Sequence, residues 1–147
     1  MIISIACDHG GFPLKTELVK ILRAKNYEVL DRGSYDLNRV DYPEYAKAVC
    51  EDVVSKTASF GVLICTTGIG MSIYANKWKG IRAALVTNLE SAHLTRQHND
   101  SNIITMGARF TSIEDASLYV EAFVNESFEG GRHERRVNMI NDKENEQ

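Results

Sequence analysis

The sequence predicts a three-layer α/β/α sandwich, in which a Rossmann-like parallel sheet of five strands has helices on both faces. Two observations support this fold class. Short β-branched or apolar runs alternate along the 147 residues with stretches whose apolar residues recur at helical spacing, and such alternation is typical of βαβ units. Hydrophobic residues make up 44% of the chain and charged residues 25%, a balance that suits one core in a single domain spanning residues 1–147.

The amino-terminal part is expected to alternate strand, helix and strand. The β-branched run at residues 2–7 predicts the first strand, and apolar residues recur every three or four positions after Pro13, which predicts an amphipathic helix. Residues 27–30 read as the second strand. A loop rich in Gly, Asp and Asn follows over 31–41, and Pro43 suits the first turn of the next helix.

The middle of the chain centres on the third strand, residues 60–64. This run is apolar throughout, as expected for a strand that is covered on both faces. It ends at Cys65, where a glycine-rich turn leads into a short helix that ends at Ala75. Residues 81–86 then predict the fourth strand, and residues 89–96 the helix after it.

The carboxyl-terminal part supplies the last strand and two more helices. Residues 102–106 predict the fifth strand and residues 113–124 the helix that follows it. The glycine pair at 130–131 breaks the chain before a polar helix that begins near Arg132. The acidic end, 142–147, is expected to be frayed.

Charge and cysteine content narrow the function classes. The chain has 17 basic and 20 acidic side chains and a net charge of -3, so it lacks the basic surface that nucleic-acid binding requires. We expect no membrane segment, because no apolar run reaches the roughly 20 residues of a span. The first strand starts at Met1 without a basic leader, which predicts a cytoplasmic protein. Three cysteines are too few for a disulfide framework, so reduced thiols are expected.

Ligands of such a sheet bind beyond the carboxyl ends of the strands, so polar groups that directly follow a strand are candidate site residues. Asp8 and His9 follow the first strand, although Asp8 could equally cap the next helix. Cys65 precedes a turn whose amide dipoles favour an anion, which makes it a candidate base or nucleophile. Cys7 and Cys50 are expected to be core residues.

Three further features suit an anionic ligand. The turn at 66–70 lacks a P-loop lysine and the full dinucleotide fingerprint, but its amides can hold a phosphate or an oxyanion, unless it is an ordinary strand-to-helix turn. Arg109 follows the fifth strand. Arg132 and Arg136 are four apart, which places them on one helix face as a phosphate clamp or as a solvated charged surface. His98 is a candidate general acid or a solvated helix-end residue.

A zinc site is disfavoured, because the four histidines have no ligand spacing with the cysteines. Several sequence blocks instead occur in order along nearly the whole chain: residues 7–11, 41–43, 65–72, 75–77, 80–83, 96–100 and 130–133. Together these blocks resemble the type B ribose-5-phosphate isomerases, whose wider family includes galactose-6-phosphate isomerase subunits.

This resemblance implies interconversion of ribose 5-phosphate and ribulose 5-phosphate in the pentose phosphate pathway. It implies no metal or organic cofactor, and a homodimer, sometimes paired into a tetramer, whose active sites are shared between subunits. Cys65 would move a proton between C1 and C2 through a cis-enediolate, Thr67 would stabilise the oxyanion, and His98 would assist ring opening. The substrate-binding residues that the resemblance implies are Asp8, His9, Tyr42, Thr66, Gly68, Ile69, Gly70, Asn99, Arg109, Arg132 and Arg136.

Other functions remain open at this stage. Thr66 and Tyr74 are larger than the residues that the family pattern has at these positions, and this affects how long a sugar the site can hold. A six-carbon substrate such as allose 6-phosphate or galactose 6-phosphate is the alternative within the same class, although Cys65 and His98 in one chain favour a self-sufficient homo-oligomer. The alternatives from other classes are a non-catalytic phosphosugar- or nucleotide-binding module and, with less support, a flavodoxin-type flavin protein.

Overall fold

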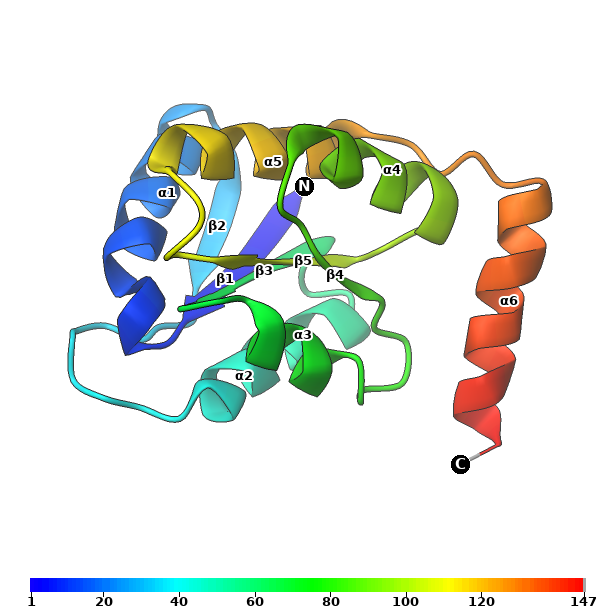
Figure 1. Ribbon diagram of the computed structural model, residues 1–147, viewed down its shortest axis with the longest axis horizontal. Helices are drawn as coiled ribbons and strands as arrows, with labels where there is room; N and C mark the ends of the chain where they lie inside the picture. Colours follow the sequence, from blue (N-terminus) through cyan, green and yellow to red (C-terminus); the bar gives the residue numbers. More distant parts are fainter. Residues whose placement is uncertain (147) are drawn as a thin grey trace.

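Five parallel strands form one sheet in the order β2-β1-β3-β5-β4 (Figure 1). The computed structural model describes residues 1–146. The strands are β1 (Ile2–Cys7), β2 (Glu28–Asp31), β3 (Phe60–Cys65), β4 (Ala83–Leu85) and β5 (Ile103–Gly107). Because β4 lies at the edge and β5 lies beside β3, the carboxyl ends of β1, β3 and β5 adjoin one another.

Helices cover both faces of the sheet, which confirms the predicted three-layer sandwich (Figure 1). One face carries α1 (Phe12–Ala24), α4 (Leu89–Asn99) and α5 (Ile113–Asn125), and the other carries α2 (Tyr42–Val54) and α3 (Ile69–Ala75). A short 3-10 helix, η1 (His9–Gly11), precedes α1, and the last helix is α6 (Arg132–Asn145). None of these helices combines the length and apolar character that a membrane span needs, within residues 1–146.

The alternation of side chains along each strand divides the core into two layers. Ile5 and Ile64 point toward α1 and α5, whereas Ala6 and Leu63 point toward α2 and α3. This period of two is the geometry of an extended strand. Cys65 follows Ile64 and therefore belongs to the layer beneath α2 and α3.

Three predicted boundaries are wrong by more than one residue. The fourth strand begins at Ala83 rather than residue 81, because the Arg82 amide donates to the side-chain oxygen of Asn102. α4 continues to Asn99, beyond the predicted end at residue 96, and stops where Asp100 adopts a left-handed conformation (φ 46°).

α6 is the third correction, since it continues through Asn145 into the segment predicted to fray. A hydrogen bond of 3.0 Å from the Gly80 amide to Glu144 ties its last turns to the loop before β4. α6 stands beside the β4 edge of the sheet and contacts the helix layers only through α4, near its own start (Figure 1). A groove of about 700 Å³ lies between them, with Ala83 and Asn99 on one wall and Met139 and Ile140 on the other.

Candidate active site

The turn after β3 is built around the sulfur of Cys65. This side chain is 5% exposed, and its Sγ accepts a hydrogen bond of 3.1 Å from the Gly68 amide. Gly68 has a left-handed backbone (φ 78°), and a Cβ there would lie 2.7 Å from the carbonyl carbon of Met106. Glycine is therefore required for the turn to fold back over β5 and aim an amide at the sulfur. Such an amide stabilises negative charge on the sulfur.

Thr67 presents its hydroxyl from the same turn. Its Oγ1 accepts a hydrogen bond of 3.3 Å from the Ile69 amide, so the hydroxyl proton can be donated to another acceptor. Gly70 lies in the first turn of α3, where backbone amides have no partner within the helix. Thr67 and Gly70 can thus donate to an oxyanion, whereas the Gly68 amide is directed at Cys65.

The loop after β1 brings Asp8 to this turn. The Asp8 amide donates to Ile64 O of β3, and its Oδ1 accepts from the amides of Gly10 (2.9 Å) and Gly11 (3.1 Å). Asp8 therefore does act as a cap, but of η1 rather than of α1, whose N-cap is Gly11. A Cβ on Gly10 would overlap the hydroxyl of Thr66, so this glycine is what lets Thr66 approach the Asp8 loop.

His9 and Tyr42 flank the same end of the sheet. Nδ1 of His9 accepts a hydrogen bond of 3.2 Å from the Val40 amide, which assigns the proton of the neutral ring to Nε2. The Tyr42 ring lies against Gly70, where an added Cβ would come within 2.5 Å of its Cζ. Both side chains are partly exposed, so they can meet a ligand.

Arg109 belongs to this end as well. The Ala108 amide donates to Cys65 O at 2.9 Å, and the Arg109 amide donates to Thr66 O at 3.1 Å. These bonds extend the pairing of β3 and β5 beyond the strands. The Arg109 side chain is exposed beside the turn.

His98 and Asn99 lie at the opposite end of the sheet. They end α4, which leads into the amino end of β5, and the Nε of Arg82 donates to Asn99 O at 3.1 Å just before β4. A strand rises about 3.3 Å per residue, so the five residues of β5 separate the two ends by about 16 Å. One chain therefore does not bring His98 to Cys65.

Arg132 and Arg136 share this distant position. Both lie in the first turns of α6, are exposed, and follow Gly131, whose left-handed backbone (φ 58°) starts the helix. The predicted phosphate-binding residues thus fall into two groups. His9 and Arg109 lie beside Cys65, and the two α6 arginines lie beside His98.

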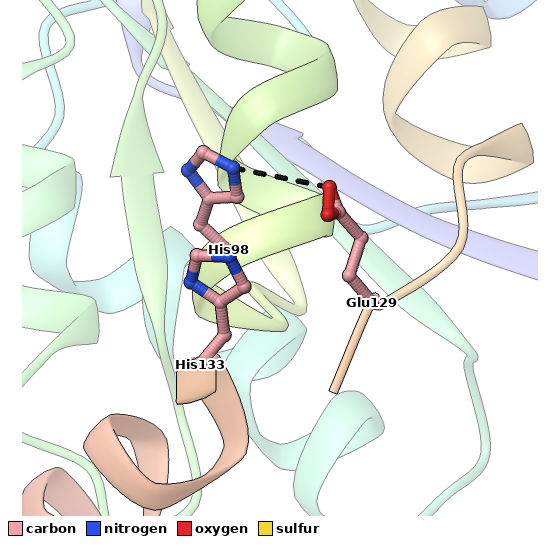
Figure 2. A group of neighbouring side chains, drawn as sticks. All are labelled: His98, Glu129 and His133. Atoms are coloured by element: carbon pink, nitrogen blue, oxygen red, sulfur yellow. Dashed lines mark ion pairs between the residues drawn. The ribbon is translucent and has the colours of Figure 1, made fainter. Parts of the chain in front are cut away.

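Sequence reasoning missed that His133 and Glu129 gather around His98 (Figure 2). The rings of His98 and His133 stack with centroids 4.2 Å apart and an interplanar angle of 12°. Nε2 of His98 lies 3.9 Å from a carboxylate oxygen of Glu129. The prediction against zinc considered only the spacing between histidines and cysteines, whereas the fold brings together residues more than 30 positions apart, which no local motif could reveal.

The other two cysteines have a structural role, as predicted. Cys7 and Cys50 are fully buried in the two core layers. Burial raises the pKa of Cys7, and it raises the pKa of Cys50 to about 12. Neither thiol ionises readily at neutral pH, so Cys65 is the candidate for thiolate chemistry.

Comparison with known proteins identifies the family. The family model described as Ribose/Galactose Isomerase matches residues 3–140. Ribose-5-phosphate isomerase B of Escherichia coli K12 is 45% identical over 138 residues, which cover 94% of this chain and 93% of that protein. The Clostridium thermocellum enzyme superposes with a TM-score of 0.97 at 42% identity, covering 99% of both chains.

A Mycoplasma genitalium ribose-5-phosphate isomerase B, solved with bound ribulose-5-phosphate, superposes with a TM-score of 0.95 at 38% identity. The match covers 99% of this chain and 97% of that one. Family model, sequence relatives and solved structures agree over nearly the full length. The chain therefore belongs to the ribose/galactose isomerase family.

Proposed function

We propose that this protein is an aldose–ketose isomerase that interconverts ribose 5-phosphate and ribulose 5-phosphate. The observation that carries the proposal is the Cys65 sulfur, held by an amide at the carboxyl end of β3 beside the Thr67 hydroxyl. Proton abstraction next to a carbonyl requires a base at the carbon and donors at the developing oxyanion. The related enzymes named above support the assignment of the substrate.

The reaction moves one proton from C2 to C1 and a second from O2 to O1, and it leaves all other atoms in place. The thiolate of Cys65 removes the proton from C2 of the open-chain aldose, and the electron pair moves toward the carbonyl oxygen at C1. Thr67 and the Gly70 amide donate to the resulting cis-enediolate. The thiol then returns its proton to C1, and transfer of the hydroxyl proton from O2 to O1 completes the ketose.

Ring opening and phosphate binding need the other group of residues. His98 assists opening of the furanose, Asn99 binds the sugar, and Arg132 and Arg136 hold the phosphate. Because these side chains lie at the opposite end of the sheet from the Cys65 turn, we propose a homodimer in which each site joins Cys65 of one subunit to His98 of the partner subunit. The homodimer can further pair into a tetramer.

Exposed apolar side chains support this arrangement. Ile69 and Ile73 of α3 are 50% and 59% exposed beside the Cys65 turn, and Met139 and Ile140 of α6 are 62% and 47% exposed beside the groove. Packing α3 of one copy into the groove of another would bury both pairs and carry the Cys65 turn toward His98. Burial of such surface favours association.

Thr66 supports a five-carbon over a six-carbon substrate. Its side chain adjoins Gly10 and the Asp8 loop, so it reduces the space at the sugar-binding end. Tyr74, the other departure from the family pattern, packs against the core layer beneath α2 and α3. The proposed reaction belongs to the pentose phosphate pathway. The ratio of kcat/KM for ribose 5-phosphate to kcat/KM for allose 6-phosphate tests the preference for the five-carbon substrate.

Incubation of the protein with ribose 5-phosphate in deuterium oxide tests the reaction directly. We expect deuterium at the carbon positions between which the proton moves, together with formation of ribulose 5-phosphate. Binding of the sugar phosphate without deuterium incorporation would identify a non-catalytic module instead. Incorporation with allose 6-phosphate but not with ribose 5-phosphate would identify a six-carbon isomerase.

A further inference from the structure

The cluster of His98, Glu129 and His133 has the composition of a metal site. We propose that these three side chains bind one divalent transition-metal ion, with Zn²⁺ as the best match, and that the bound ion inhibits the enzyme. The proposal that a metal ion binds at this cluster rests on the geometry alone. The inhibition rests on the proposed function, because it requires that His98 take part in ring opening.

The geometry of the three side chains is close to that of a ligand set. One donor atom from each of the three lies within 4.8 Å of the other two. Ligands at the 2.0–2.1 Å of a tetrahedral zinc site are roughly 3.4 Å from one another, so closure needs shifts of about 1 Å. The side chains of His98 and Glu129 are 37% and 49% exposed, which leaves them room to make these shifts.

Each ring directs one nitrogen to the side on which Glu129 lies (Figure 2). Because the rings are nearly parallel, their in-plane lone pairs run side by side, and the rings must tilt toward each other to share one ion. Two imidazoles and one carboxylate are the protein ligands of a common class of open zinc site, in which the fourth position holds water or substrate. The cluster thus predicts an ion with one exchangeable position.

Backbone contacts hold the ligands in place before any ion binds. The Glu129 amide donates to Gln97 O at 3.0 Å, so the segment that carries Glu129 is tied to the last turn of α4, next to His98. The His133 amide donates to Gly130 O at 3.1 Å at the start of α6, and the His133 side chain is 8% exposed. The three ligands therefore come from segments whose relative position is already fixed.

The charges next to the cluster limit the strength of binding. Arg132 and Arg136 are positive neighbours of the cluster, so a cation binds less tightly than in a structural zinc site. We therefore expect reversible binding.

A bound ion would block the proposed role of His98. The lone pair that ligates the metal is the one that would carry a proton to or from the sugar ring. Opening of the furanose would then slow, while Cys65 and Thr67 of the same subunit, at the other end of its sheet, would not contact the ion. Inhibition should be relieved by a chelator.

Cobalt titration of the full-length, chelator-treated protein tests the binding without any activity measurement. We expect one Co²⁺ per chain, with the intense visible absorption of a four- or five-coordinate ion, displaced by Zn²⁺. Glu129→Gln should weaken the affinity at least tenfold. The matched control Glu134→Gln, an exposed acid nearby on α6, should bind Co²⁺ like the wild type. Equal affinity of wild type and Glu129→Gln, or no Co²⁺ binding, would overturn the proposal.

The Cys65→Ser variant shows whether the ion binds at the cluster of His98, Glu129 and His133 or at the Cys65 thiol. If the ion binds at the proposed cluster, this variant keeps the visible Co²⁺ spectrum and the affinity. Loss of Co²⁺ binding in Cys65→Ser would assign the ion to the thiol and overturn the cluster.

The activity measurement tests the inhibition separately. Zn²⁺ should inhibit the wild type reversibly, and Glu129→Gln, measured against its own zinc-free rate, should require at least tenfold more Zn²⁺ for half inhibition. Zinc that binds the cluster without slowing turnover would overturn the inhibitory role. If the protein shows no isomerase activity at all, the proposed function fails, and the cobalt titration still decides the metal site.

Discussion

The two ends of the sheet hold their functional groups in different ways. At the carboxyl end, the backbone sets the positions of Cys65 and Thr67, because Gly68 and Gly107 allow main-chain contacts that a Cβ would prevent. At the amino end, His98 and Arg132 stand on helix termini, with side chains that extend from the surface. One end is a preformed turn, and the other is a set of projecting side chains.

This difference matches the two kinds of work that the proposed reaction demands. Stabilising a transient oxyanion requires donors that are fixed before the charge develops, and a glycine-dependent turn supplies them. Groups that reach into the site of a second copy must lie on an exposed surface. Substitutions at each end can test whether the chemistry belongs to the turn and the binding to the projecting side chains.

The largest effect is expected at Cys65. Cys65→Ser should lower kcat by about 10²–10⁴-fold, the usual contribution of a positioned base, because a serine hydroxyl is a far weaker base at neutral pH. Deuterium incorporation from solvent into the sugar phosphate measures this step. Cys50→Ser is the matched control, since Cys50 is a buried core thiol; it should retain turnover in the folded fraction. A wild-type exchange rate in Cys65→Ser would show that Cys65 is not the base.

Thr67 should come next. Removing one oxyanion donor costs about 10²–10³-fold in kcat, so Thr67→Ala should lower turnover with a smaller change in KM. Thr57→Ala removes a hydroxyl from an exposed position outside the site and serves as the control. Steady-state kinetics with ribose 5-phosphate distinguish the outcomes. A higher KM at unchanged kcat would make Thr67 a binding group only.

Mixing two inactive variants tests whether the ends meet in a dimer. Cys65→Ser and His98→Asn should each be impaired, and random subunit exchange should restore about a quarter of the wild-type sites, because half of the dimers would be mixed and each would hold one intact site. The isomerase assay after mild denaturation and refolding of the mixture measures this recovery. Activity no higher than the mean of the two parents would place the whole site in one chain.

Arg136 should affect binding more than chemistry. Arg136→Met should raise KM for ribose 5-phosphate about tenfold or more, since a hydrogen bond to a charged group contributes about 1.5–3 kcal/mol, while kcat changes little. Arg135→Met, at the neighbouring exposed position of α6, should change KM far less. A fall in kcat at unchanged KM would contradict a pure phosphate-binding role.

The smallest effect concerns the scaffold rather than either end. Burial acts to raise the pKa of Asp52, but hydrogen bonds from Arg32 and Ser4 outweigh it and lower this pKa below the ordinary 3.8. The stabilisation from the Asp52 carboxylate is therefore complete above about pH 4 and is lost as the pH falls through its pKa in the folded state.

Asp52→Asn should lower the free energy of unfolding by about 1–3 kcal/mol at pH 7, and this difference should shrink under acid conditions. Urea unfolding at several pH values measures it. Glu129→Gln, at an exposed acid, should leave stability nearly unchanged. A constant difference between wild type and Asp52→Asn down to pH 2 would contradict the assigned ionisation.

Much of the fold could be predicted because it depends on local patterns. The apolar runs of β1 and β3 and the helical periodicity after Pro13 fix the element types, since period and glycine position are local properties. The ends of α4 and α6 could not be predicted in this way. The end of α4 depends on a left-handed Asp100, a conformation that a residue other than glycine rarely adopts. The end of α6 depends on the contact between Gly80 and Glu144, which joins distant parts of the chain.

The sequence by itself determined the candidate chemistry. Cys65 before a glycine-rich turn, Asp8 after the first strand and two arginines four residues apart are visible in the order of residues, because each uses short-range geometry. The tertiary structure alone decided which of them share an end of the sheet. It placed His98 at the other end of β5 from Cys65 and stacked it on His133. A strand separates its two ends by its full length, while the path of the chain brings residues that are distant in sequence together.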